Sequence, residues 1–213
     1  MTELVLAADK WVTNGDLIAD CAWLGYLKPN WYTLDPTYGR GLWWSQWQPN
    51  DLVTKNRPTD GSDFRKLDFG TSSFDAIAYD PPYMAKGGRT TSTIDEMDDR
   101  YGLEDCPPTP ALLQELINDG LTEMHRIVRP CTKRGAAGGG IVLVKCMSYV
   151  SGGRFWPGAN HTLNHAFEVG FELVDMFQHI GKPGPQSQVT QVHARNNYST
   201  LYVLQKQRKK KVS

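Results

Sequence analysis

A tetrapeptide that follows an apolar, strand-like run could hold an amino group for reaction. Residues 74–79 read FDAIAY, which is typical of a buried strand, and Asp80, Pro81, Pro82 and Tyr83 come directly after them. Prolines fix the backbone and carry no N–H donor, so the carbonyl groups of this turn are left to accept hydrogen bonds from another molecule. The aspartate adds a second acceptor, and the tyrosine adds a flat surface for stacking. Together these groups suit a planar molecule that bears an exocyclic NH2 group.

A second candidate site lies at the end of an earlier predicted strand. The strand expected over residues 31–34 is followed by the heptapeptide DPTYGRG at 35–41, and a helix is expected just beyond it. Glycines let a backbone approach a ligand closely, and open α/β sheets bind ligands at the carboxyl ends of their strands. A nicotinamide dinucleotide site is disfavoured, because the large Trp44 stands three residues after Gly41, where a GxGxxG motif needs a small residue. A structural turn without a ligand stays open as the alternative.

These two patterns, in this order, resemble those of the AdoMet-dependent DNA amino-methyltransferases, and the chain is similar to the short DNA methylases of phages and actinobacteria. The tetrapeptide DPPY is similar to the catalytic motif of that family, and DPTYGRG to its cofactor motif. The run IVLVKC at 141–146 resembles the strand that follows the family's linking helix. QVHARNNYST at 191–200 resembles the approach to its last strand. The resemblance spans roughly residues 35–205.

The resemblance implies a site for S-adenosyl-L-methionine. The residues that would shape the methionine pocket belong to the first loop: Asp35, Thr37, Gly39 and Gly41. Asn56 stands nearest the place where the family usually has an acidic residue for the ribose hydroxyls, with Asp51 and Asp60 close by in sequence. The pair Asp63-Phe64 resembles the one that binds the adenine ring, with the carboxylate accepting from the amino group and the phenyl ring stacking.

The reaction implied by the resemblance is methyl transfer to an exocyclic amine of a DNA base, with adenine N6 favoured. Such a nitrogen shares its lone pair with the ring, so it is a poor nucleophile until hydrogen bonds from both its protons draw it toward a tetrahedral geometry. The Asp80 carboxylate and the Pro81 carbonyl would accept those bonds while the sulfonium delivers the methyl group in line. Pro82 would stiffen the turn, and Tyr83 would stack on a base rotated out of the duplex. No metal is expected.

Four further residues are predicted to contact the DNA substrate: Lys145, His193, Arg195 and Asn196. A solvent-exposed lysine at a strand end and an ordinary polar turn before the last strand are the alternatives for these residues. The segment 84–110 is predicted to be a long loop or lid, because it is polar and too long for an ordinary connection. The recognition sequence stays open, as does the presence of a homodimer or a separate specificity partner.

Two other functions remain alternatives at this stage. Related tetrapeptides act on RNA, so an RNA base or a cytosine N4 methyltransferase is one of them. The other is a non-catalytic nucleic-acid-binding protein with a methylase fold, for which a damaged cofactor pocket would be expected. The complete DPTYGRG and DPPY motifs argue against that second alternative, whereas Asn56 leaves some room for it.

The elements that would position these residues alternate between strand and helix, which is typical of a parallel sheet. We predict a helix over 16–26 capped by Asn14, then strands at 52–54 and around Phe64. A helix over 111–128, a strand at 141–146, a helix over 161–169 and strands at 171–177 and 199–205 follow. The last two strands are expected to be antiparallel because the loop between them is short for a crossover helix. The prediction is a Rossmann-like class I methyltransferase fold, with a mostly parallel sheet and an antiparallel last strand.

The composition is that of a folded protein with a core. The 213 residues are 40% hydrophobic and 22% charged, which excludes disordered, collagen-like and coiled-coil classes and favours one domain, placed at residues 1–205. No apolar run approaches the roughly 18 residues of a membrane span, and residues 1–10 do not read as a signal peptide. We therefore expect a cytoplasmic protein without a membrane partner.

Cysteines and charges complete the sequence-based expectations. The four cysteines are widely spaced and expected to be free thiols: Cys21, Cys106, Cys131 and Cys146. The chain has 23 basic and 23 acidic residues, but five of the basic ones lie in a tail at 206–213, so residues 1–205 carry five more acidic than basic side chains. This tail would either bind nucleic-acid phosphates or be a solvated end.

Overall fold

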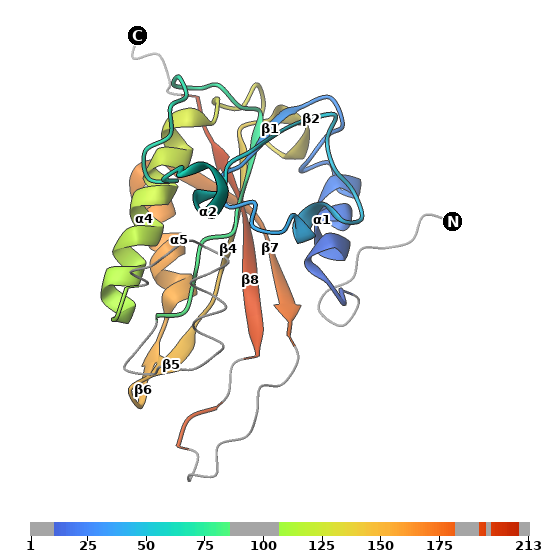
Figure 1. Ribbon diagram of the computed structural model, residues 1–213. Helices are drawn as coiled ribbons and strands as arrows, with labels where there is room; N and C mark the ends of the chain where they lie inside the picture. The colour runs from blue at the N-terminus through green and yellow to red at the C-terminus, as the bar shows by residue number, and fades with distance from the viewer. Residues whose placement is uncertain (1–10, 86–106, 182–191, 195–196, 209–213) are drawn as a thin grey trace.

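The centre of the molecule is one six-stranded sheet. The computed structural model describes residues 11–85, 107–181, 192–194 and 197–208. Within them the strand order is β2-β1-β3-β4-β8-β7 (Figure 1). The strands of this sheet are β1 Tyr32–Asp35, β2 Asp51–Thr54, β3 Ala76–Tyr79, β4 Ile141–Cys146, β7 Phe171–Ile180 and β8 Tyr198–Lys206. The first four run parallel, and β8 is antiparallel to both of its neighbours, which confirms the predicted sheet.

Helices cover both faces of the sheet. Figure 1 shows α4 (Pro110–Ile127) and α5 (Gly158–Val169) together on one face and α1 (Asn14–Trp23) on the other. Strand side chains alternate between two core clusters, as the period of a strand requires. Ile77 and Tyr79 pack with α4, whereas Ala76 and Ala78 pack with α1. The result is a three-layer α/β fold in which β3 and β4 are buried on both faces.

Helix α1 differs from its prediction at the first turn. The predicted cap, Asn14, is instead the first residue of the helix, and Thr13 is the cap. The Thr13 hydroxyl accepts from Asp16 N, and the Asp16 carboxylate accepts from Thr13 N, which is a capping box. A threonine followed three residues later by an acidic residue was therefore the stronger start signal.

Helix α4 follows its prediction closely and involves a residue that was assigned to the tail. Its C-terminal carbonyl groups, His125 O and Val128 O, accept hydrogen bonds from Lys206 Nζ at 2.7 and 2.8 Å. Lys206 is also the last residue of β8. The predicted basic tail at 206–213 therefore begins one residue too early, because the first of its five cations satisfies a helix end.

The structure differs from the sequence prediction at several short elements. No strand forms around Phe64, so that expectation was wrong. The expected helix after Gly41 is only a single 3-10 turn, η1 (Leu42–Trp44). Four short elements were missed. Two of them, β5 Tyr149–Ser151 and β6 Arg154–Trp156, form a hairpin, and the other two are α2 Arg57–Asp60 and η2 Ala136–Gly138. Most of the predicted lid, residues 86–106, lies outside the described residues.

Three of the predicted free thiols can be placed. Cys21, Cys131 and Cys146 are free and buried, and Cys106 lies outside the described ranges. Among the residues that the structure describes, no three His, Cys, Asp or Glu side chains gather in a way that could hold a metal ion. None of the helices in those ranges combines the length and the apolar character needed to cross a membrane.

Candidate active site

The loop after β1 is fixed over the carboxyl ends of two strands. Lys55 N, just after β2, donates to Asp35 O at 2.8 Å, and Tyr38 N donates back to Lys55 O at 3.1 Å. Gly41 N closes a turn onto Tyr38 O at 2.8 Å. The DPTYGRG segment is thus held at the edge of the sheet where ligands of open α/β folds bind.

Gly39 and Gly41, the two glycines of this loop, have different surroundings. Both have positive φ, 53° at Gly39 and 70° at Gly41. A Cβ on Gly41 would lie 2.5 Å from the Tyr38 hydroxyl, so the tyrosine ring would have to move to admit a side chain there. Of the described residues, a Cβ on Gly39 would meet only Thr37 O, at 3.8 Å. The backbone at Gly39 is therefore open to approach, as a small-molecule site requires.

Asp35 is a buried carboxylate with donors on both oxygens. Its Oδ1 accepts from Thr37 N at 2.9 Å and from the Thr37 hydroxyl at 3.4 Å, and its Oδ2 accepts from Trp44 Nε1 at 2.7 Å. Burial raises the pKa of Asp35 to about 7, and the hydrogen bonds from Trp44 and Thr37 oppose this rise. Asp35 therefore joins the loop to the residues that follow it.

Asp80, at the end of β3, is held by the same loop. Its backbone N–H donates to the Thr37 hydroxyl at 2.8 Å, and Trp43 Nε1 donates to its Oδ2 at 2.9 Å. The other carboxylate oxygen, Oδ1, is buried and has no hydrogen-bond partner among the described residues. Burial raises the pKa of Asp80, whereas the nearby Lys145 charge and the Trp43 hydrogen bond lower it. The predicted catalytic carboxylate thus has one oxygen fixed and one unsatisfied.

The rest of the tetrapeptide leads toward the hairpin. Pro81 and Pro82 are buried, and Tyr83 is half-buried against the core. Tyr83 lines a cavity of about 10 Å³ with Cys146 and Trp156, and burial raises the pKa of its hydroxyl. Two residues on, Ala85 N donates to the Tyr149 hydroxyl of β5 at 3.3 Å. The stacking role of Tyr83 stays a prediction.

Asn56, the residue predicted nearest the ribose position, lies beside the loop after β1. Its Nδ2 donates to Gly39 O at 3.4 Å, and its backbone N–H donates to Asp60 Oδ2 at 3.3 Å. Asp51 is the first residue of β2, so it lies at the opposite end of that strand. Of the three residues considered for the ribose, Asn56 and Asp60 are therefore the ones at the correct edge, and the contact itself stays a prediction.

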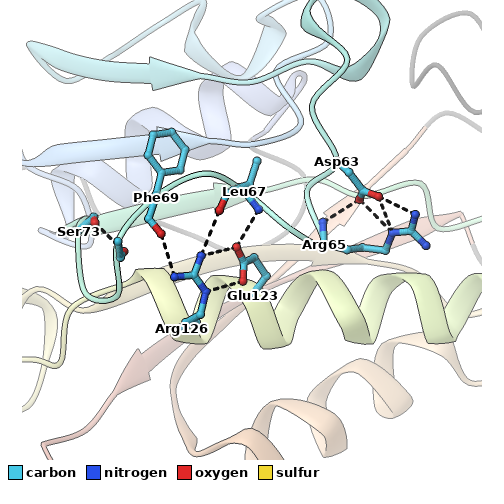
Figure 2. Close-up of polar contacts among 8 residues, drawn as sticks. Asp63, Arg65, Leu67, Phe69, Ser73, Glu123 and Arg126 are labelled. Carbon is cyan, nitrogen blue, oxygen red and sulfur yellow. Dashed lines mark hydrogen bonds and ion pairs between the residues drawn. The ribbon is translucent and has the colours of Figure 1, made fainter.

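Both residues of the predicted adenine-binding pair have partners within the protein, and Figure 2 shows those of Asp63. Asp63 forms an ion pair with Arg65, whose Nη2 lies 2.6 Å from Asp63 Oδ2. Phe64 is buried and packs edge-to-face on Tyr79, with ring centroids 5.5 Å apart. Binding of an adenine ring here would compete with Arg65 for the carboxylate. The assignment of Asp63 and Phe64 stays a prediction.

Two residues of α4 that the sequence analysis missed hold the segment that carries this pair (Figure 2). Glu123 accepts from Leu67 N at 2.8 Å and forms an ion pair with Arg126 at 2.6 Å. Arg126 in turn donates to Phe69 O at 2.8 Å and to Leu67 O at 3.2 Å. The helix thus supplies the hydrogen bonds that a strand neighbour would have supplied. In the sequence, Glu123 and Arg126 are only an acidic and a basic residue three positions apart on a helix, a spacing that does not predict a contact with residues 67–69.

The residues predicted to bind substrate fall into three situations. Lys145 is buried, so the solvent-exposed alternative for it was wrong. His193 Nε2 lies 2.7 Å from Gly153 O, in the turn of the hairpin. Arg195 and Asn196 lie outside the described residues. Lys145 is near enough to Asp80 for its charge to lower the pKa of that carboxyl, and His193 contacts the hairpin.

The two adjacent tryptophans were the other residues missed as site components. The sequence analysis used Trp44 only to argue against a dinucleotide motif. In the structure Trp43 and Trp44 are buried, and their indole N–H groups reach Asp80 and Asp35. The signal was present, because two large residues with a polar handle directly follow the glycine turn.

Solved structures share this fold at low sequence identity. No protein-family model matches the chain, and no curated protein matches it. A protein from Bacillus halodurans designated a methyltransferase aligns with a TM-score of 0.52 and 14% identity, over 90% of this chain and 99% of that one. A protein from Thermus thermophilus designated a DNA modification methylase and complexed with S-adenosyl-L-methionine aligns with a TM-score of 0.45 and 12% identity, over 71% of this chain. The chain spans 56% of that second protein. The first likeness confirms the Rossmann-like methyltransferase fold.

Proposed function

We propose that the chain transfers a methyl group from S-adenosyl-L-methionine to an exocyclic amino group of a DNA base, adenine N6. The observation that carries this proposal is the state of Asp80. It has one oxygen fixed by Trp43 and one buried oxygen without a partner among the described residues, at the carboxyl end of a central strand. A buried acceptor of this kind is costly unless another molecule supplies the missing donor.

The loop after β1 has the features that a cofactor would need. The open backbone at Gly39 allows close approach, and Asn56 stands beside it with an amide that could bind hydroxyl groups. Asp35 lies within this loop and would favour a ligand that bears positive charge whenever its carboxyl is ionised. When bound, S-adenosyl-L-methionine supplies an electrophilic methyl group on a sulfonium.

The chain's own residues would then prepare the nucleophile. Asp80 Oδ1 would accept one N–H of the amine, and the adjacent Pro81 carbonyl would accept the other. Because burial raises the pKa of Asp80, its carboxylate is also a better acceptor for the proton that the methylated amine must lose. Pro82 limits the freedom of the turn, and Tyr83 would contact the ring of the base.

The test is a transfer assay with identified products. Purified protein and methyl-labelled S-adenosyl-L-methionine are incubated in three parallel reactions, with duplex DNA, with single-stranded DNA and with RNA. Digestion to nucleosides followed by mass spectrometry should show N6-methyl-2′-deoxyadenosine in the DNA reactions. N4-methylcytosine in the DNA would replace adenine with cytosine as the target base. Label in RNA alone would replace DNA with RNA as the substrate. Label in none of the nucleic acids would contradict the proposal.

A further inference from the structure

Lys145 is a buried lysine at the carboxyl end of β4. It is only 4% exposed, and its ammonium group donates a hydrogen bond to Asn14 Oδ1, at the start of α1, at a distance of 2.5 Å. A lysine tied to a helix inside the fold is not placed to bind a phosphate in solvent. Its burial therefore calls for an explanation within the protein.

The strand register puts Lys145 beside Asp80. Tyr79 of β3 pairs with Val144 of β4 in parallel register, so the next residues along, Asp80 and Lys145, are neighbours. The residues two positions earlier on each strand pack into the cluster under α1. Because side chains alternate along a strand, both Asp80 and Lys145 project toward α1.

The charges of these two residues are complementary. Asn14 is a neutral amide, so it can bind the ammonium group but cannot balance its charge. A buried cation without an anion nearby is strongly unfavourable. Asp80 supplies that anion, and each charge opposes the effect of burial on the other group's pKa.

Among the residues that the structure describes, the other ionisable groups around Asp80 do not supply positive charge. Asp35 lies at the end of β1 and would repel a second negative charge. Burial raises the pKa of Tyr83 and of Cys146, so both are neutral near pH 7. Burial and the charge of Lys145 lower the pKa of His179 in β7, so it too is neutral near pH 7.

We propose that Lys145 is a positioning residue of this site: anchored by Asn14, it keeps the Asp80 carboxylate ionised. An ionised carboxylate can accept the N–H of a substrate amine with its open oxygen, whereas a protonated carboxyl could present an O–H there instead. This inference rests on the proposed methyl transfer for its catalytic meaning, but the pairing of charges can be measured without it.

The first measurement is the titration of Asp80 itself. Carboxyl carbons are followed by NMR against pH in the wild-type protein, in Lys145→Met and in Lys133→Met, and the Asp80 signal is assigned by its loss in Asp80→Asn. Lys133 is exposed in the loop before β4, at the opposite end of that strand. The apparent pKa of Asp80 should rise by about one to three pH units in Lys145→Met, as expected for loss of an adjacent opposite charge, and should not change in Lys133→Met. An unchanged Asp80 titration would overturn the inference.

Further variants separate charge from packing. Lys145→Arg keeps the positive charge and should titrate like the wild type, whereas Lys145→Gln should reproduce the rise and serves where Lys145→Met does not fold. A rise of equal size in Lys145→Arg would assign the effect to packing and overturn the inference.

The second measurement is the pH dependence of methyl transfer. Its acidic limb should move to higher pH in Lys145→Met by the same amount as the Asp80 titration. If wild-type protein transfers no methyl group, the proposed function fails while the titration still decides the pairing. If wild-type protein is active and the acidic limb does not move, the role of Lys145 fails while the proposed function stands.

Discussion

The carboxyl ends of β1 and β3 each carry an aspartate that accepts a hydrogen bond from a tryptophan of the same turn. Trp44 donates to Asp35, and Trp43 donates to Asp80. The difference lies in the second oxygen. That of Asp35 receives two donors from Thr37, whereas that of Asp80 has no partner within the described ranges. The same residue type is therefore satisfied within the fold at one strand end and keeps an open hydrogen-bond acceptor at the other.

The most direct way to break this comparison is to remove the open carboxylate. Asp80→Ala should lower methyl transfer about 100-fold to 1000-fold, because the amine loses a preorganised acceptor. Affinity for S-adenosyl-L-methionine, measured by calorimetry, should change little. Asp51→Ala is the matched control, since Asp51 is exposed at the amino end of β2. Undiminished turnover in Asp80→Ala would contradict the assignment of Asp80.

The β1 end can be tested separately through its open glycine. Gly39→Val should weaken S-adenosyl-L-methionine binding at least about tenfold, because a branched side chain would occupy the approach and is strained at positive φ. Gly135→Val is the control, since Gly135 also has positive φ and open surroundings but precedes η2. Calorimetry on folded protein compares the two. Equal affinity in both variants would place the cofactor elsewhere.

Much of this comparison could be predicted from the sequence. The apolar runs, α4 and the DPPY turn are determined by local patterns, so β3, β4 and the position of Asp80 were predicted correctly. The strand expected around Phe64 did not form, because the hydrogen bonds of that segment go to Glu123 and Arg126, about 60 residues later in the chain. No local pattern could specify such a partner.

The environment of the two aspartates was also beyond the sequence. The contacts of Trp43, Trp44 and Lys145 depend on how η1, α1 and β4 meet over the sheet edge, which is a tertiary arrangement. Asn14 illustrates the point: it was expected to cap a helix, and instead it is the hydrogen-bond partner of a buried lysine.

The paired tryptophans offer a finer test. Trp43→Phe and Trp44→Phe should each lower the free energy of unfolding by about 1–3 kcal/mol, because each leaves a buried carboxylate oxygen without a donor. Only Trp43→Phe should also reduce kcat, by about tenfold. The acidic limb of its pH–rate profile should move to higher pH as well, because the Trp43 hydrogen bond lowers the pKa of Asp80. Chemical denaturation and pH–rate profiles measure the two effects. Equal losses of kcat in both variants would remove the distinction between the two strand ends.

The smallest expected effect is a pH dependence of stability caused by Asp35. Its folded-state pKa, about 7, lies above the ordinary value of 3.8, so the folded protein holds this proton more tightly than the unfolded chain does. The stabilisation is complete below the unfolded pKa and is lost as the pH rises through about 7. Between pH 6 and 8 the Asp35 carboxyl should account for a loss of about 1.4 kcal/mol in the free energy of unfolding.

The measurement compares the wild type with Asp35→Asn, whose side chain cannot ionise and should therefore not show this loss. Urea denaturation of both proteins at pH 6, 7 and 8 gives their free energies of unfolding. The difference between the two proteins should grow in favour of the variant as the pH rises. Groups that titrate alike in both proteins cancel in that difference. A constant difference across the three pH values would mean that Asp35 is ionised throughout, held so by Thr37 and Trp44, and its burial would then be fully compensated by those hydrogen bonds.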